Sequence, residues 1–239
     1  MAMAKRRHRF AKLLLAALIT AGVFASFWLG LVPQRWSPFA PLSLSEPSQW
    51  FVDLRLAALR RDRALCRASL IGSAISAQPI DDQPTKDGCG WQNAVSVSAA
   101  GGARVNAAQL TCETAAALAL WMQHEVQPAA MRTLGSRVTA LDTLGTYACR
   151  NIIGSRALTA FRSQHATANA IDISGFRFAD GRSVSLARDW SGGDQRKSEF
   201  LRLVHARACA YFRVALSPDF NAAHRDHFHF DRGLMWRCK

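Results

Sequence analysis

The sequence predicts an α+β protein with a mostly antiparallel sheet and flanking helices, preceded by one N-terminal transmembrane helix. An uncharged apolar segment follows a basic N-terminus. Beyond it, short apolar alternations are separated by turn residues, and helical segments fall between them without strict strand–helix alternation. The domain from about residue 60 to residue 239, some 180 residues, is long enough to bury one sizeable core.

Residues 1–12 carry five basic side chains, and residues 13–32 carry no charge before Pro33 ends the segment. Twenty helical residues span about 30 Å, the thickness of the hydrocarbon core of a bilayer. A cleaved signal peptide is the alternative, although its apolar region is usually shorter, roughly 7–15 residues, and residues 23–25 make a poor cleavage site. The pattern favours a retained anchor with residues 1–12 as a cytoplasmic tail.

The composition of residues 33–59 predicts a linker that is followed by the start of a helix. Prolines, including Pro38, and serines are frequent over residues 33–48, which is typical of a short extended linker that holds a domain away from the membrane. Apolar residues among arginines over residues 49–66 predict the helix. We place the functional domain at residues 60–239.

Within this domain, Asp-Gly pairs predict turns at residues 87–90 and 180–181. The second turn joins two short β-rich segments into a hairpin. The predicted strands cover residues 94–97, 137–141, 176–178, 183–186 and 213–216, and the predicted helices cover residues 112–126 and 194–211, the latter capped by Asp194.

All six cysteines follow the apolar segment. An even number on the exported side predicts three disulfides in an oxidising compartment. The sequence cannot choose the pairing, and we take the sequential pairs Cys66–Cys89, Cys112–Cys149 and Cys209–Cys238 as the working prediction. Metal ligation is the alternative, but no two cysteines have C-x-x-C spacing.

The net charge of +13 would suit nucleic acid, an anionic membrane surface or an acidic polymer. Five of the basic residues precede the apolar segment, and no run of five like charges follows it. There is also no nucleic-acid-binding motif. We interpret the charge as a solvated, arginine-rich surface and expect no nucleic-acid partner.

Three histidines, His224, His227 and His229, fall within six residues. The last two alternate with Phe228 and Phe230, which predicts a strand with both imidazoles on one face and both phenyl rings in the core. Residues i and i+2 lie roughly 6.6 Å apart along a strand. One histidine could therefore bind a metal ion while the other reaches the water beside it.

Upstream, His165 and Asp172 are separated by alternating alanines, which would let the chain approach a cofactor closely. Asp172 lies between Ile171 and Ile173, which again predicts a strand with the carboxylate on the face opposite the core. Two imidazoles and one carboxylate are a known ligand set for catalytic zinc, with the fourth position left to water. Together the two segments predict a split zinc site.

The segment Ser163-x-His165-x-x-Ala168-x-Ala170-x-Asp172 resembles the S-x-H-x-x-G-x-A-x-D signature of zinc D-Ala-D-Ala peptidases, with Ala168 where glycine is usual. The His224-x-x-His227-x-His229 spacing resembles the second signature of penicillin-insensitive murein endopeptidases. Both groups belong to the superfamily that joins lysostaphin, the D-Ala-D-Ala peptidases and the sonic hedgehog domain. Most of residues 60–239 is similar to the bacterial extensin-like C-terminal domain family.

This resemblance implies that His165, Asp172 and His229 bind Zn²⁺ and that His227 faces the catalytic water as its base, for which an imidazole pKa near 6.5 is suitable. The D-Ala-D-Ala peptidases use a glutamate base where this chain has Asp226, whose shorter side chain could instead orient an imidazole. His224 could stabilise an oxyanion or assist His227. Arg150 could clamp a peptide carboxylate or stabilise the oxyanion.

The expected function is that of a membrane-anchored zinc peptidase acting on peptidoglycan cross-links, located in the bacterial inner membrane with its domain in the periplasm. The alternative is a non-catalytic, zinc-containing cell-wall-binding module, because fold and zinc do not prove hydrolysis. His224 and His227 favour the enzyme. The scissile bond, of D,D or L,D type, and the oligomeric state stay open.

Overall fold

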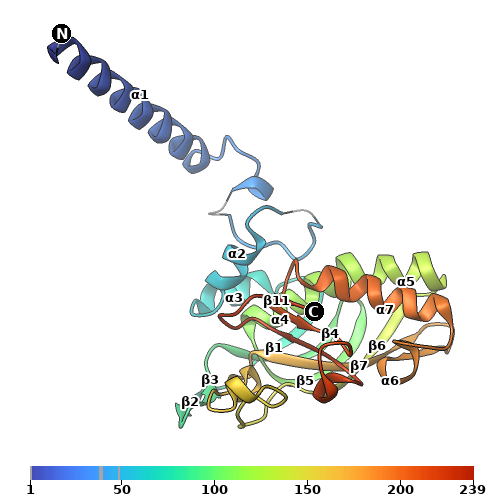
Figure 1. Ribbon diagram of the computed structural model, residues 1–239. Helices are drawn as coiled ribbons and strands as arrows, with labels where there is room; N and C mark the ends of the chain where they lie inside the picture. Colours follow the sequence, from blue (N-terminus) through green and yellow to red (C-terminus); the bar gives the residue numbers. More distant parts are fainter. Residues whose placement is uncertain (1, 38–39, 48) are drawn as a thin grey trace.

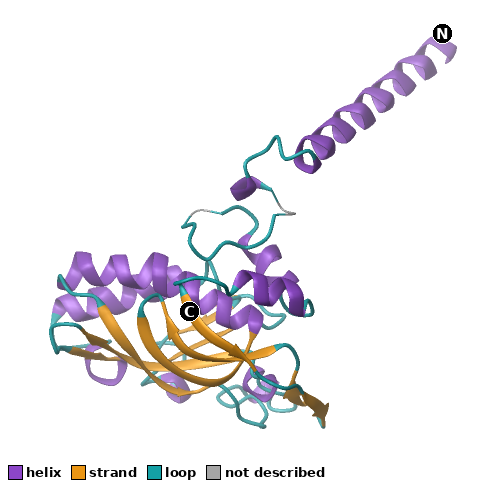
Figure 2. Ribbon diagram, turned by 180° about the vertical axis from the view of Figure 1, so that it is seen from behind, coloured by secondary structure: helices purple, strands orange, loops and turns teal. Residues whose placement is uncertain are grey.

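The computed structural model describes residues 2–37, 40–47 and 49–239. A long helix, α1 (Ala2–Trp28), projects from a domain in which helices cover one face of a large, curved sheet (Figures 1 and 2). The sheet is mostly antiparallel. The predicted α+β class is therefore confirmed.

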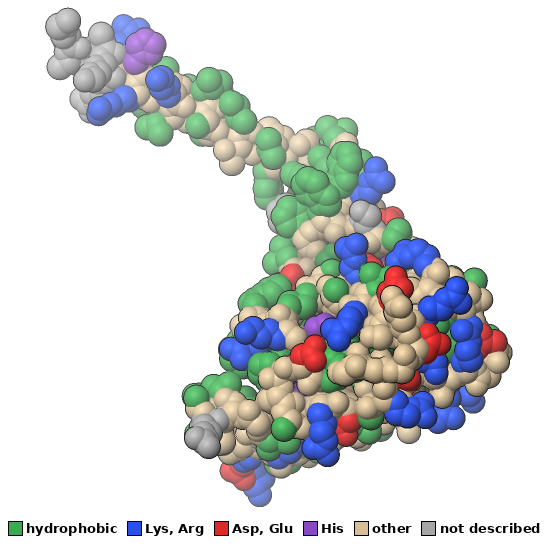
Figure 3. All heavy atoms as spheres, turned by 45° about the vertical axis from the view of Figure 1, so that its right-hand side comes forward, with side chains coloured by type: hydrophobic (Ala, Val, Ile, Leu, Met, Phe, Trp, Pro, Cys, Tyr) green, Lys and Arg blue, Asp and Glu red, His purple; other side chains and the backbone are tan. Residues whose placement is uncertain are grey.

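Within α1, residues Arg7–Trp28 are long and apolar enough to cross a membrane, a test that a signal sequence also passes. Apolar side chains cover the helix, and Lys and Arg gather towards its N-terminus (Figure 3). Gly30 adopts the left-handed conformation, with φ of 69°, and the Leu31 N–H donates to the carbonyl of Ser26. Such a cap ends the helix before residue 32.

The segment that we expected to be a free linker is partly packed on the domain. Leu42 and Leu44 are buried in the core, and the His124 Nε2 atom lies 2.9 Å from the carbonyl oxygen of Leu44. Arg55 of α2 (Val52–Ala58) donates to the carbonyl of Ser37. Pro38 of the predicted linker lies outside the described residues.

The helix predicted over residues 49–66 is divided into α2 and α3 (Arg63–Ser69). The Asp62 side chain accepts a hydrogen bond from the Leu65 N–H, so it caps a new helix. A short 3₁₀ turn, η1 (Gln34–Trp36), precedes them.

Among the described residues, one sheet has the strand order β1-β4-β5-β6-β7-β10-β9-β11, and β8 pairs with β7. Neighbours are antiparallel except for β5 with β6 and β9 with β11. A separate hairpin turns at Asp87 and Gly88, as predicted. The strands are β1 (Ile75–Pro79), β2 (Gln83–Lys86), β3 (Cys89–Trp91), β4 (Ala94–Ala100), β5 (Ala103–Thr111), β6 (Val138–Gly145), β7 (Ala170–Phe178), β8 (Ser183–Ser185), β9 (Val214–Leu216), β10 (Phe228–Asp231) and β11 (Arg237–Cys238).

The helix predicted over residues 112–126 is longer than expected. It comprises α4 (Cys112–Trp121), a π-helical turn η2 (Met122–Val126) and α5 (Gln127–Leu134). Pro128 does not end the helix, because it lies in the first turn of α5, where proline is tolerated. Every residue of α4 is buried, as expected of a helix that is apolar all round. Asp194 caps α7 (Gln195–Ala208) as predicted. The short helices are α6 (Leu186–Asp189), η3 (Arg156–Leu158), η4 (Gln164–Thr167) and η5 (Ala222–His224).

The core between sheet and helices is centred on aromatic rings. Trp121 of α4 makes edge contacts with Phe212 and Phe230, whose ring centroids lie 6.4 and 5.2 Å from its own. Phe228 and Phe230 are fully buried. Their alternation with His227 and His229 therefore leaves the imidazoles to the opposite face of the sheet.

The six cysteines form three disulfides, Cys66–Cys112, Cys89–Cys149 and Cys209–Cys238. Only the last was predicted, and the sequential pairing of the other four cysteines is wrong. The reason is tertiary: α3 packs on α4, which brings Cys66 to Cys112. Cys89 in the β2–β3 hairpin is left to meet Cys149, which follows β6.

A buried cluster of charges joins α2, α4 and the end of β10. Arg232 is 1% exposed, and it pairs with Glu113 and Asp53 at 2.8 Å each. Arg60 pairs with Glu113 at 2.7 Å, and Arg213 pairs with Asp53 at 2.9 Å. The cluster holds the chain directly after Asp231.

Candidate metal centre

The antiparallel pairing of β7 with β10 places Asp172 directly opposite His229. Directly opposed residues have Cβ atoms about 5 Å apart, so their side chains leave the same face together. Ile171, Ile173 and both phenylalanines of β10 are buried on the other face. The polar and apolar faces predicted separately for residues 171–173 and 227–230 therefore coincide when the two strands pair.

His165 reaches the same face from η4, whose first turn is capped by the Ser163 side chain. Ser163 is thus a turn residue rather than a partner of the imidazoles. Ala168 then takes the left-handed conformation, with φ of 53°, and directs the chain into β7. The peptidase signature has glycine at this position. The left-handed conformation costs alanine about 1 kcal/mol relative to glycine.

Three donor atoms converge. His165 Nε2 lies 3.2 Å from His229 Nδ1 and 3.1 Å from Asp172 Oδ1, and His229 Nδ1 lies 2.9 Å from Asp172 Oδ1. Zinc–ligand distances near 2.0–2.1 Å in a tetrahedron require donor separations of about 3.3 Å. The residues present therefore fit a tetrahedral ion with one position left open, and such an ion would replace the hydrogen bonds among them.

Asp231 completes the surroundings of His229. Its Oδ2 lies 3.0 Å from His229 Nε2, the ring nitrogen that faces away from the other two donors. A carboxylate on the second nitrogen of a ligating histidine orients the ring and raises its basicity. Asp231 is itself held because its Oδ1 accepts the Gly233 N–H at 2.8 Å.

The two carboxylates determine the charge at this centre. Burial alone would raise the pKa of Asp172, but hydrogen bonds from His165 and His229 outweigh burial and hold it well below its usual value. Burial would lower the pKa of His229, but Asp172 and Asp231 raise it to about 9. Without a metal ion, His229 therefore carries a proton at neutral pH.

His227 stands beside the three donors rather than among them. Its Nε2 lies 3.8 Å from Asp172 Oδ1, and its Nδ1 lies 2.9 Å from Asp226 Oδ1. The hydrogen bond to His227 lowers the pKa of Asp226. Asp226 thus contacts His227 and leaves the imidazole Nε2 on the side of the donors.

His224 is fixed by Asn221. Its Nδ1 lies 2.7 Å from Asn221 Oδ1, which also accepts the Ala223 N–H. Burial, followed by the charges of His229 and His227, lowers the pKa of His224 to about 4. The ring is therefore neutral at pH 7 with its proton on Nδ1, so its Nε2 can accept a hydrogen bond but cannot donate one to an oxyanion.

Asp172, His224, His227 and His229 line a cavity of about 470 Å³, and Arg150 lines it too. Arg150 is near enough for its charge to help lower the pKa of His224. Cys149, the preceding residue, is held by the disulfide to Cys89. The structure therefore brings five of the six predicted site residues, Asp172, His229, His227, His224 and Arg150, to one cavity. The sixth, His165, is 2% exposed and contacts two of them, with its Nε2 3.1 Å from Asp172 Oδ1 and 3.2 Å from His229 Nδ1.

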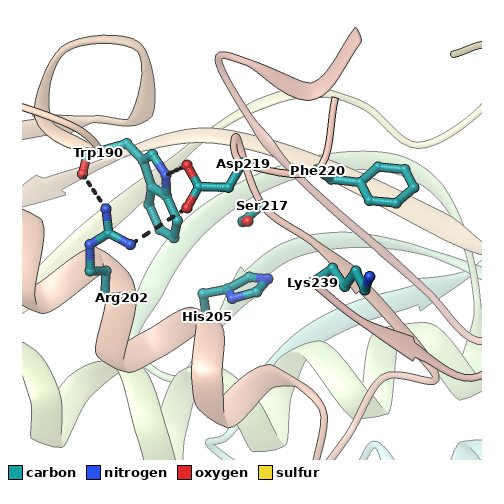
Figure 4. Close-up of a pocket in the computed structure, with 7 residues that line it drawn as sticks. All are labelled: Trp190, Arg202, His205, Ser217, Asp219, Phe220 and Lys239. Carbon is teal, nitrogen blue, oxygen red and sulfur yellow. Dashed lines mark hydrogen bonds and ion pairs between the residues drawn. The ribbon is translucent and has the colours of Figure 1, made fainter. Parts of the chain in front are cut away.

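Another hollow, lined by Trp190 and Asp219, contains paired polar groups (Figure 4). The Trp190 Nε1–H donates to Asp219 at 2.8 Å, and Arg202 lies over the Trp190 ring and 3.5 Å from the same carboxylate. Burial lowers the pKa of His205, which lies 3.3 Å from the Ala215 carbonyl oxygen. Among the residues that the structure describes, this hollow brings together no group of potential metal ligands like the three donors of His165, Asp172 and His229.

Two residues of the centre were missed from the sequence. Asp231 continues the alternation of His227 and His229 on the same face, so the strand pattern itself contained the signal. Asn221 precedes His224 by three residues in an irregular segment, and no local sequence pattern predicts its hydrogen bond with the His224 ring.

The fold and the site define an α+β protein with a histidine- and aspartate-lined centre on the open face of its sheet. The family model for the extensin-like protein C-terminus matches residues 64–239, and the chain belongs to this family. No curated protein and no solved structure matches the chain.

Proposed function

We propose that the protein is a membrane-anchored, zinc-dependent peptidase that acts on peptidoglycan cross-links. The observation that carries the proposal is the set of three donor atoms, His165 Nε2, Asp172 Oδ1 and His229 Nδ1, within 3.2 Å of one another. Two neutral imidazoles and a carboxylate suit zinc in a catalytic, open geometry.

Zinc at these donors would act as a Lewis acid on a substrate carbonyl. It would also lower the pKa of water, so that hydroxide could form near neutral pH and attack this carbonyl. His227 is the group placed to move the proton. Its Nδ1 is engaged by Asp226, so Nε2 is the atom that would take the proton from water and pass it to the leaving amine. Asp226 would stabilise the imidazolium that forms.

The hydrogen bond from His224 to Asn221 argues against His224 as an oxyanion donor. Among the predicted site residues, Arg150 is the cation in the cavity that could perform that task or bind a peptide carboxylate. His224 would act through its neutral ring, which lies 5.3 Å from that of His227 and excludes water from one side of it.

A location on the outer side of the inner membrane is supported by three features. All six cysteines are paired, which is typical of an oxidising compartment. The candidate spanning helix precedes the domain. Trp28 ends this helix and is exposed, as are Trp36 and Trp50, whose ring centroids lie 6.4 Å apart in the segment that follows; tryptophan is favoured at a membrane interface.

The substrate class rests on the resemblance to D-Ala-D-Ala peptidases and murein endopeptidases at residues 163–172 and 224–229. Peptidoglycan peptides carry the carboxylates that Arg150 could bind. A cell-wall-binding module with the same zinc site is the alternative that the following experiment separates.

The full-length, zinc-loaded protein should release muropeptides from purified sacculi, as identified by mass spectrometry. His227→Ala should retain zinc and lower the rate by about 10²–10⁴, the usual contribution of a general base. His165→Ala should lose both zinc and release. His124→Ala, which removes a histidine outside the cavity, should retain both.

Unchanged release by His227→Ala would refute the assignment of the base. A wild-type protein that binds one zinc ion but releases no product from any peptide substrate would favour the binding module. Failure of the folded protein to bind zinc would refute the site itself.

A further inference from the structure

Exposed apolar side chains gather at the cavity of the candidate centre. Among the described residues after position 54, the exposed large apolar ones are Ile71, Met131, Leu144, Ile153, Phe161, Leu234, Met235 and Trp236. Ile153, Phe161, Leu234 and Met235 line the cavity. Phe161 is 61% and Leu234 83% exposed. A soluble surface normally scatters such residues, so their concentration in a cavity indicates a binding site.

Two segments that are far apart in sequence supply this apolar wall, and each is held in place. Ile153 and Phe161 lie in a loop between β6 and β7, which the Ile152 N–H closes by donating to the Phe161 carbonyl at 2.9 Å. Leu234 and Met235 lie between β10 and β11. There, the disulfide Cys209–Cys238 and a hydrogen bond from Arg213 to the Gly233 carbonyl anchor the chain.

The charged residues of the cavity outside the metal centre are arginines. Arg150, Arg162 and Arg237 line it, and none of them forms a salt bridge with an Asp or Glu of the described residues. Arg162 donates to the Asp87 carbonyl and to Asn151 Oδ1, which are neutral acceptors. Its charge is therefore held in position and remains available to an anion.

We propose that this wall is a subsite for a bulky apolar group on an amide substrate that also carries an anionic group. The assignment of the ligand as a substrate rests on the amide hydrolysis of the proposed function and not on peptidoglycan as the substrate, because the group that fits this wall is larger than an alanine side chain. The methyl group of an alanine, as in a D-Ala residue, would leave Phe161 and Leu234 in water. The fitting group is larger, either an aromatic or long aliphatic peptide side chain or an acyl chain on the amide.

The test uses the full-length, zinc-loaded protein in lipid nanodiscs, with empty nanodiscs as the background. Two pairs of probes are compared by calorimetry: N-acetyl-Ala-Leu-Phe with N-acetyl-Ala-Ala-Ala, and N-octanoyl-glycine with N-acetyl-glycine. Both members of a pair carry one carboxylate. Burying one such apolar group in a half-open cavity should make the apolar member bind about tenfold more tightly.

Substitutions then locate the preference. Phe161→Ser and Leu234→Ser should each reduce it, and the double variant should abolish it. Leu144→Ser is the matched control, because Leu144 is 59% exposed but lies outside the cavity. Arg162→Gln should weaken both members of a pair about equally. Thermal unfolding of each variant checks that the fold is intact.

Equal affinities within both pairs, or a preference that survives in the double variant, would overturn the subsite. A preference confined to one pair supports it and identifies the source of the apolar group. Apolar preference without hydrolysis of any amide would support the subsite and count against the peptidase. Hydrolysis of sacculi together with equal affinities within both pairs would support the peptidase and count against the subsite.

Discussion

Asp231 and Asp226 each hold one imidazole of the candidate centre, but the two imidazoles have different proposed tasks. Asp231 orients His229, a proposed ligand, and Asp226 contacts His227, the proposed base. Asp231→Asn should weaken zinc binding about 10–100-fold, as removal of such supporting carboxylates does. Asparagine keeps the Oδ1 atom that accepts the Gly233 N–H, so the fold should persist. Competition with a chelator of known affinity measures the change.

Asp226→Asn is the paired control for this prediction. It should leave zinc affinity nearly unchanged and lower the rate of peptide release, because it disturbs only His227. Equal loss of zinc in both variants would contradict the division of tasks between the two carboxylates.

The proton on His229 makes zinc binding depend on pH. Because the pKa of His229 is raised to about 9, the ring is protonated at neutral pH and must lose this proton before it can bind zinc. Affinity should therefore rise with pH, by about tenfold per unit for a single displaced proton, and level off above pH 9. Chelator competition at pH 6, 7, 8 and 9 tests this sign. An affinity independent of pH would show that His229 does not have to lose a proton.

At the level of elements, the buried charge cluster connects α2, α4 and β10. Glu113 accepts from both Arg60 and Arg232, and it has no exposed surface. Glu113→Gln would leave the buried guanidinium of Arg232 with Asp53 as its one remaining carboxylate partner and should reduce the free energy of unfolding by about 3 kcal/mol. Chemical denaturation of the full-length protein in detergent, followed by tryptophan fluorescence, measures this loss.

Arg177→Gln is the surface counterpart, since Arg177 pairs with Asp142 at 2.8 Å where both side chains are exposed. Its loss should cost less than about 1 kcal/mol. If both variants lost a similar amount of unfolding free energy, the ion pairs of Glu113 would contribute no more to stability than an exposed pair does.

The elements themselves could be predicted where one local pattern dominated. Asp194 starts α7 and the Asp-Gly turn at 180–181 joins β7 to β8, as expected. β5 was not predicted, because its alanines, arginine and asparagine have weak strand preference and only pairing with β4 and β6 stabilises it. The helix end at residue 126 was wrong because η2 continues without interruption into α5.

At the scale of the whole molecule, the disulfides join segments that lie apart in sequence. Proteolysis without reduction should yield peptides linked through Cys66–Cys112, Cys89–Cys149 and Cys209–Cys238. Mass spectrometry before and after reduction identifies them. Recovery of Cys66–Cys89 or Cys112–Cys149 would contradict the packing of α3 on α4.

The sequence by itself determined which faces of two strands carry polar side chains, because a period of two assigns alternate residues to opposite faces whatever lies beside them. Asp172, His227 and His229 could therefore be assigned to open strand faces, whereas the grouping of His165 with Asp172 and His229 followed from the resemblance to zinc peptidases. The apolar N-terminal helix could be recognised from its composition. Only the tertiary structure decided the partners: Cys66 with Cys112, Asp231 with His229, Arg232 with Glu113, and the apolar wall made from two distant segments. Such contacts depend on strand order and register, and these follow from packing of the whole chain rather than from any local pattern.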